Sequence, residues 1–181
     1  MSTRRISSSS GWIDHQQLPK GPNGRARCRW CEAEVPKGRR SFCGDDCVHQ
    51  HRLRSDPGYL REQVFNRDRG LCAACGVDCD RIERAFKRLL RKAGLKISHY
   101  PRILERYPDR YGPLEVFREQ FPWFKPQLSA WAADHIVPVV EGGGECGLEN
   151  LRTLCLGCHA VATRQLRERL KRDSQPPAAA D

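Results

Sequence analysis

The chain of 181 residues carries 32 Lys and Arg against 22 Asp and Glu, a formal net charge of +10, and ten cysteines. This length accommodates one ordinary domain or two small ones, and the basic excess favours a polyanion such as nucleic acid as partner. No segment has the apolar run of a membrane span or a secretory signal, so we expect a soluble intracellular protein, in the cytoplasm, nucleoid or nucleus, with reduced cysteines.

Two tails flank the region expected to fold. Residues 1–24 are polar, rich in Ser, Gly and Pro and without periodicity, which predicts a flexible arm, and residues 173–181 predict a similar tail. The cysteine pattern divides the remainder into an N-terminal zinc module at 25–54 and a larger domain at 55–172, which contains a helical insertion at 80–129.

The first predicted helix lies within the stretch SDPGYLREQVFNRDRG, residues 55–70. Ser55 or Asp56 is placed to cap it, Pro57 fits its first turn, and Gly70 follows its end. This helix leads into the second group of cysteines.

The clearest helical periodicity lies in the stretch DRIERAFKRLLRKAG. Apolar residues recur there at i, i+3 and i+4, Asp80 and Glu83 predict a capping box, and Gly94 predicts the end of the helix. The outer face is basic, and Arg88 and Arg91 on it are predicted to contact nucleic-acid phosphates. An ordinary solvated helix face is the alternative.

Residues 97–129 are aromatic and interrupted by prolines, which predicts two short helices whose aromatic side chains pack in a small core. The last helix is predicted for residues 156–171, with Ala162, Leu166 and Leu170 facing inward. Its basic side chains predicted to contact a nucleic-acid backbone are Arg164, Arg167 and Lys171.

Eight of the ten cysteines fall into two sets with the spacing of zinc ligands. Zinc binds four thiolates in a tetrahedron, and two residues between cysteines let both sulfur atoms reach one ion from a single turn. The first set is Cys28, Cys31, Cys43 and Cys47, and the second is Cys72, Cys75, Cys155 and Cys158. The sequence therefore predicts two structural zinc ions, each contributing on the order of 10 kcal/mol to folding and no chemistry.

Other roles for these side chains stay open. His49 or His51 can replace a thiolate in the first set, and Cys79 can compete in the second, which leaves Cys146 spare. A thiol–disulfide oxidoreductase is the alternative class of protein, and it requires a CxxC of low pKa without metal.

The residues suited to hydrolytic chemistry gather between Trp131 and Gln165. Asp134 and His135 precede IVPVV, a β-branched run that predicts a strand. Asn150 follows a Gly-rich segment and precedes a second predicted strand, LRTLC, and His159 stands at the start of the last helix. Hydrolysis of a phosphodiester needs a base that takes a proton from water and a cation beside the phosphate.

Three segments of this stretch, DHIVPV, GGG and ENLRTLCLGCH, resemble the motif of the zinc-stapled HNH endonucleases, with 14 residues between His135 and Asn150 and eight between Asn150 and His159. From Cys28 through RSDPGYLREQVFNRDRGLCAACG, the chain is also similar to the HNH domain attached to eukaryotic annealing helicases. The resemblance implies a small α+β fold, a zinc-stabilised and treble-clef-like ββα-metal core with added helices.

The resemblance also implies a metal-dependent endonuclease that hydrolyses DNA phosphodiester bonds. Asp134 and His159 would hold the catalytic divalent ion, Mg²⁺ or Mn²⁺, His135 would act as general base, and Asn150 would pin the loop that aims His135. The alternative is a catalytically silent zinc module that binds nucleic acid or a protein partner.

One position departs from the family pattern. The motif usually carries a basic residue three positions after its last histidine, where this chain has Ala162. Arg164 is near in sequence but lies on a different face of the predicted helix. The resemblance therefore leaves the basic residue that assists at the phosphate unassigned.

Overall fold

The computed structural model combines several helices with one two-stranded sheet and describes residues 14–99, 112–125, 128–144 and 147–174. It contains two compact units. One comprises the chain up to Asn66 together with His135–Leu151, and the other comprises Arg67–Asp134 together with the chain from Arg152 onward. Among the described residues, no helix is both long and apolar enough to cross a membrane.

The N-terminal part of the first unit is rich in loops. The 3-10 helix His15–Gln17 opens it, and the Glu34 carboxylate accepts hydrogen bonds from the backbone N–H groups of Asn23 and Arg25, at 3.0 and 2.9 Å. Its small core consists of Leu18, Ala26, Cys28 and Val35. Because so little apolar surface is buried, this segment depends on another source of stability.

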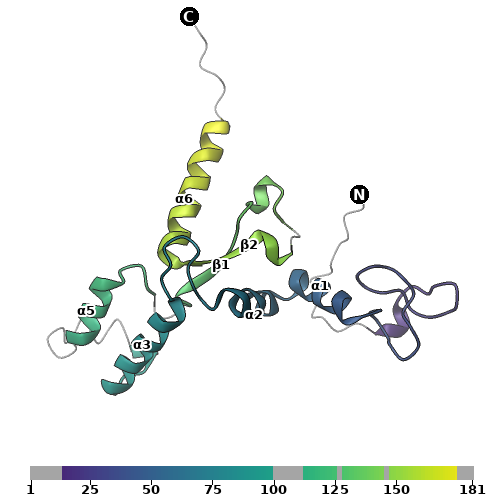
Figure 1. Cartoon of the computed structure of the whole chain (residues 1–181), viewed down its shortest axis with the longest axis horizontal. Coiled ribbons are helices and arrows are strands. Elements are labelled where there is room, and N and C mark those ends of the chain that lie inside the picture. The colour runs from purple at the N-terminus through teal and green to yellow at the C-terminus, as the bar shows by residue number, and fades with distance from the viewer. Residues whose placement is uncertain (1–13, 100–111, 126–127, 145–146, 175–181) are drawn as a thin grey trace, which may run out of the picture. The chain divides into compact units, whose positions relative to one another are not determined.

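Two helices follow in the same part of the chain, α1 (Asp45–Ser55) and α2 (Pro57–Asp68), as Figure 1 shows. Asp56 caps α2 by accepting a hydrogen bond from the backbone N–H of Tyr59 at 3.0 Å, and Val64 is fully buried. The helix predicted for this region, with Asp56 as its cap, is confirmed.

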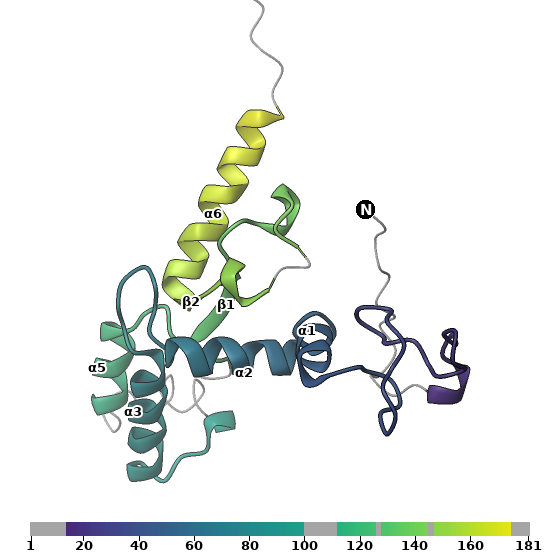
Figure 2. The same ribbon diagram turned by 45° about the vertical axis from the view of Figure 1, so that its right-hand side comes forward.

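The core of the second unit forms between α3 (Cys79–Lys92) and α5 (Gly112–Gln120), which lie side by side in Figures 1 and 2. Its buried members are Ile82, Phe86, Leu90, Leu114 and Phe117. The partly buried side chains Phe121, Trp123 and Phe124 pack against it, which confirms the prediction that the aromatic residues here form a core. Besides α5, a 3-10 helix spans Ile97–His99, while residues 100–111 lie outside the described residues.

The start of α3 differs from the prediction. Asp78, rather than Asp80, caps the helix by accepting a hydrogen bond from the N–H of Arg81 at 2.8 Å. The carboxylate of Glu83 accepts instead from the N–H of Ala130 at 2.6 Å, just before the first strand. The predicted capping box was wrong because its glutamate makes a tertiary contact that sequence spacing does not reveal.

The sheet contains β1 (Trp131–His135) and β2 (Leu151–Cys155). Just beyond the end of β1, the Ile136 N–H donates to the Asn150 carbonyl, just before the start of β2, at 2.8 Å. The two strands are therefore antiparallel. In Figure 1 they lie side by side, and α6 (Leu156–Asp173) continues directly from β2.

The strand predicted for IVPVV was wrong. Residues 136–138 are irregular, Val139–Glu141 form a 3-10 helix, and the four aliphatic side chains are between 46% and 68% exposed. Pro138 lacks the N–H group that a ladder needs, and β-branched residues favour strands only where neighbours bury them. The strand lies immediately before this run, and the second predicted strand, LRTLC, is confirmed.

The helix predicted for residues 156–171 is confirmed as α6, but few of its side chains are buried. Ala162 and Leu166 are half-buried, whereas Leu170, predicted to face inward, is 38% exposed. None of the residues of α6 is fully buried. Its C-terminal half is therefore surrounded mainly by solvent within the described structure.

Asp68 connects the end of α2 to β2. Its carboxylate accepts hydrogen bonds from the N–H and hydroxyl of Thr153 at 3.0 and 2.9 Å and pairs with the Arg67 guanidinium at 2.6 Å. The hydrogen bond from Arg67, followed by those from Thr153, holds the pKa of Asp68 below its ordinary value although burial opposes the shift. Asp68 is thus an anion that stabilises the folded chain.

Asp68→Asn is expected to lower the free energy of unfolding at pH 7 by about 1–2 kcal/mol, because asparagine keeps an acceptor but loses the charge. The folded-state pKa is depressed, so this stabilisation is complete above the unfolded-state value of about 3.9 and is lost as the pH falls through the lower folded-state value. Urea unfolding of both proteins between pH 7 and pH 3 measures the difference, which must shrink on acidification. A difference independent of pH would contradict the role of the charge.

Candidate functional site

The second set of cysteines converges within the second unit. Their sulfur atoms all lie within 4.8 Å of one another, and the Sγ atoms of Cys75 and Cys155 are 3.9 Å apart. In a tetrahedral site with Zn–S bonds of about 2.3 Å, sulfur atoms are about 3.8 Å apart. The cluster of Cys72, Cys75, Cys155 and Cys158 therefore fits a structural zinc ion.

The first set of cysteines forms a similar cluster in the other unit. The Sγ atom of Cys43 lies 3.4 Å from that of Cys31 and 3.3 Å from that of Cys47, and Cys28 completes the group within 4.8 Å. Both predicted sets are thus brought together by the fold, and the nine described cysteines form no disulfide.

The chemistry of each cluster also favours a cation. Although burial opposes it, backbone N–H groups around Cys72, those of Cys155, Cys75 and Ala74, lower the pKa of its thiol to about 7. Burial and the neighbouring sulfur atoms raise the pKa of Cys158. Without a metal only part of the cluster ionises readily, whereas zinc stabilises four thiolates together.

The alternative ligands do not join these clusters. His49 Nδ1 hydrogen-bonds the Tyr59 hydroxyl at 2.8 Å, and the buried ring of His51 packs edge-on against Phe42. Cys79 is fully buried, and burial raises the pKa of its thiol to about 12. The last cysteine, Cys146, lies outside the described residues.

The turn of the second cysteine cluster fixes the start of α6. The Cys155 Sγ accepts a hydrogen bond from the Cys158 N–H at 3.4 Å, and His159 follows in the first turn of the helix. Trp123 covers this turn, since a Cβ atom added to Gly157 would lie only 3.0 to 3.2 Å from three of its atoms. The aromatic core therefore supports the segment that carries His159.

Asp134 at the end of β1 faces His159. Its Oδ1 atom lies 3.7 Å from Nε2 of His159, and the Asp134 side chain is 17% exposed, against 40% for His159. The structure thus brings together, within one unit, the carboxylate and the imidazole that the sequence predicts as ligands of a divalent ion.

A third side chain, Arg152, joins this pair and was missed from the sequence. Its Nε and Nη2 atoms contact Oδ2 of Asp134 at 3.0 and 2.9 Å. The contact follows from the register of the sheet, because pairing Ile136 with Asn150 places Arg152 opposite Asp134. The register of the two strands is the signal that predicts this contact, but the predicted first strand, IVPVV, began five residues after the observed one.

Asn150 and His135 belong to the other unit, at the two ends of the loop between the strands. The Asn150 side chain accepts from the Val137 N–H at 2.7 Å and donates to the carbonyls of Val137 and Gly143 at 3.0 and 2.9 Å. Only glycine fits at position 143, because a Cβ atom there would clash with the Val137 carbonyl. The asparagine therefore pins the loop that begins directly after His135, whose half-buried imidazole has no hydrogen bond to another described residue.

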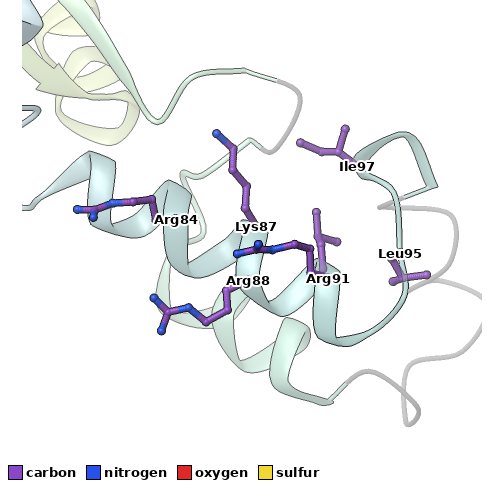
Figure 3. A pocket seen from close by; sticks show the side chains of 7 residues that line it. Arg84, Lys87, Arg88, Arg91, Leu95 and Ile97 are labelled. Atoms are coloured by element: carbon purple, nitrogen blue, oxygen red, sulfur yellow. The ribbon is translucent and has the colours of Figure 1, made fainter.

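The side chains predicted to contact nucleic acid lie on two basic surfaces. Arg164, Arg167 and Lys171 are exposed along α6. On α3, Arg88 and Arg91 line a depression of about 560 Å³, whose lining side chains are drawn in Figure 3. The other lining residues are Arg84, Lys87, Leu90, Leu95 and Ile97. Arg84 pairs with Asp80 and Lys87 with Glu83, whereas Arg88 and Arg91 form no ion pair with other described residues.

Comparison with known proteins gives a consistent result. A family model described as HNH endonuclease matches residues 123–165. The mouse protein named DNA annealing helicase and endonuclease ZRANB3 is 35% identical over 169 residues, which is 88% of this chain and 15% of that protein. The human protein of the same name is 35% identical over 130 residues, 71% of this chain and 11% of that protein.

A solved structure is also similar. The crystal structure of the human ZRANB3 HNH domain is 35% identical in sequence, with 67% of this chain and 98% of that chain covered and a TM-score of 0.39. The chain spans only about 15% of the length of the mouse relative, so it corresponds to one part of that larger protein.

Proposed function

Residues 123–165 form a domain of the HNH endonuclease family, and on this premise we propose that the chain is a metal-dependent endonuclease that hydrolyses DNA phosphodiester bonds. The observation that carries the proposal is the pair of Asp134 and His159, held 3.7 Å apart within the matched segment. The ZRANB3 relatives, named DNA annealing helicase and endonuclease, support the same activity.

Asp134 and His159 are proposed to hold one Mg²⁺ or Mn²⁺ ion. Ligand atoms at about 2.1 Å from an octahedral ion are about 3.0 Å apart when adjacent. The separation of 3.7 Å between the two ligand atoms exceeds that value by about 0.7 Å, which small rotations of the two side chains would remove. Two protein ligands leave positions for water and substrate oxygens. The ion would neutralise charge on the phosphate and on the departing 3′ oxygen.

His135 is proposed as the general base that takes a proton from the attacking water. It needs a defined orientation for this role, and the three side-chain hydrogen bonds of Asn150 hold the backbone at Val137, two residues after it, and at Gly143. Asn150 is therefore proposed as the residue that positions His135.

The basic surfaces outside this site are proposed to bind the phosphates of the DNA backbone, and these contacts do not select a base sequence. They comprise the zinc module at 25–54 and the side chains of Arg88, Arg91, Arg164, Arg167 and Lys171. The nuclease domain would span 55–172 with its insertion at 80–129 and a treble-clef-like core, followed by the tail 173–181. Of the arm predicted for 1–24, the segment that contains Leu18 packs with the zinc module instead. A DNA substrate implies a location in the cytoplasm, nucleoid or nucleus.

Binding of Mn²⁺ to the zinc-loaded protein, measured by the loss of the free-ion electron paramagnetic resonance signal, tests the ion site directly. We expect one Mn²⁺ per chain, with an affinity lowered about 100-fold in His159→Ala. Arg164→Ala on the same helix is the control and should bind Mn²⁺ normally. If the wild-type protein binds no Mn²⁺ even when DNA is present, the catalytically silent zinc module becomes the better account.

A further inference from the structure

We propose that Arg152 is a catalytic residue of this site, whose guanidinium contacts the phosphate that is cleaved and stabilises the charge that develops there. This inference rests on the proposed nuclease function. It assigns the basic group that the family motif places at position 162, where this chain has alanine.

The geometry divides the two oxygens of Asp134 between two partners. Oδ2 receives both contacts from Arg152, at 3.0 and 2.9 Å, while Oδ1 faces His159 at 3.7 Å. One carboxylate therefore separates the guanidinium from the proposed ion position. A phosphate that approaches Asp134 and His159 would then also approach Arg152.

The guanidinium retains hydrogen-bonding capacity. It has five N–H donors, and its contacts to Asp134 come from Nε and Nη2, which leaves Nη1 without a hydrogen bond to a described residue. The Arg152 side chain is 35% exposed, twice the 17% of Asp134, so part of the guanidinium reaches solvent. A guanidinium is planar and permanently charged, and it can donate two parallel hydrogen bonds to one phosphate.

Arg164, the other candidate, is placed less well. Five residues along a helix correspond to a rotation of about 140° relative to the starting residue, so Arg164 points away from the face of His159. It is exposed, and no ion pair joins it to Asp134. Among the described lysine and arginine residues, Arg152 is the one that pairs with Asp134.

Arg152 takes no part in the bond changes themselves. The water oxygen bonds to phosphorus as its proton passes to His135. The bond from phosphorus to the 3′ oxygen then breaks with its electron pair on that oxygen, which takes a proton from solvent. Arg152 would hold the non-bridging oxygens, whose negative charge grows in the transition state.

Cleavage of plasmid DNA at saturating Mn²⁺ by the zinc-loaded full chain tests this role. Arg152→Ala is expected to lower kcat about 100-fold or more while KM changes less than about threefold. Millimolar guanidinium chloride should restore part of the rate, and equal NaCl should not. Mn²⁺ affinity should stay equal or rise, because Asp134 loses a competing cation. Arg164→Ala is the matched control and should affect KM rather than kcat.

A different role would give a different result. If excess Mn²⁺ restores the rate of Arg152→Ala, or if kcat is unchanged, Arg152 only orients Asp134 and the inference is overturned. Should Arg152→Ala fail to bind two zinc ions or unfold, Arg152→Lys keeps the charge and must still lower kcat about tenfold, since lysine lacks the planar fork. A wild-type protein that cuts no DNA overturns the nuclease proposal itself, and this role with it.

Discussion

His135→Ala is expected to lower the rate of DNA cleavage about 1,000-fold while the dissociation constant for DNA stays within about twofold. General bases contribute roughly 100- to 10,000-fold to such reactions, and alanine removes the only proposed proton acceptor. The basic surfaces that would bind the DNA backbone remain intact in this variant. Single-turnover cleavage of an end-labelled duplex, beside a binding titration without divalent metal, measures both quantities.

The chain offers a matched control for this experiment. Asp14-His15 is a second Asp-His pair, with His15 Nδ1 3.8 Å from the Asp14 carboxylate, and it lies outside the segment that matches the nuclease family. His15→Ala should cleave DNA at the wild-type rate. If His135→Ala cleaved equally well, another group would have to be the base.

Cys75→Ser is expected to unfold the second unit although Cys75 is exposed. Loss of a ligand from a structural zinc site removes free energy on the order of 10 kcal/mol, comparable to the whole stability of a small domain. Zinc content should fall from two ions per chain to one. The cooperative thermal transition of this unit, which also carries Asp134 and His159, should disappear.

Cys79→Ser is the matched control, because Cys79 is fully buried and lies outside both clusters. It should keep two zinc ions and lose only about 1–3 kcal/mol for a buried hydroxyl group. Burial alone predicts the opposite order, with the exposed cysteine tolerating substitution better. Equal zinc content in both variants would contradict the proposed ligand set.

Features defined by short spacing could be predicted from the sequence. The CxxC pairs bring their two sulfur atoms to one turn by local geometry, and the fold then joins the pairs into the clusters that were expected. The capping of α2 by Asp56 and the position of His159 at the start of α6 are local in the same sense.

Features that depend on contacts between distant residues were missed. Glu83 matched a capping box in sequence, but its carboxylate binds the backbone at Ala130 instead. The run IVPVV has high β propensity, yet no strand in the described part of the chain pairs with it, and the strand forms from WAADH. Because that error displaced the register, the pairing of Arg152 with Asp134 was also missed. A propensity describes one residue, whereas a register is fixed by two strands together.

Conversion of supercoiled plasmid to open circles by the zinc-loaded wild-type protein, with Mg²⁺ or Mn²⁺ added or withheld, tests the central claim most directly. We predict cleavage only when Mg²⁺ or Mn²⁺ is present, with two zinc ions bound per chain in both conditions. A protein that binds the plasmid but cuts no form of DNA with either ion would contradict the account, and the region around Asp134 and His159 would then serve only the fold.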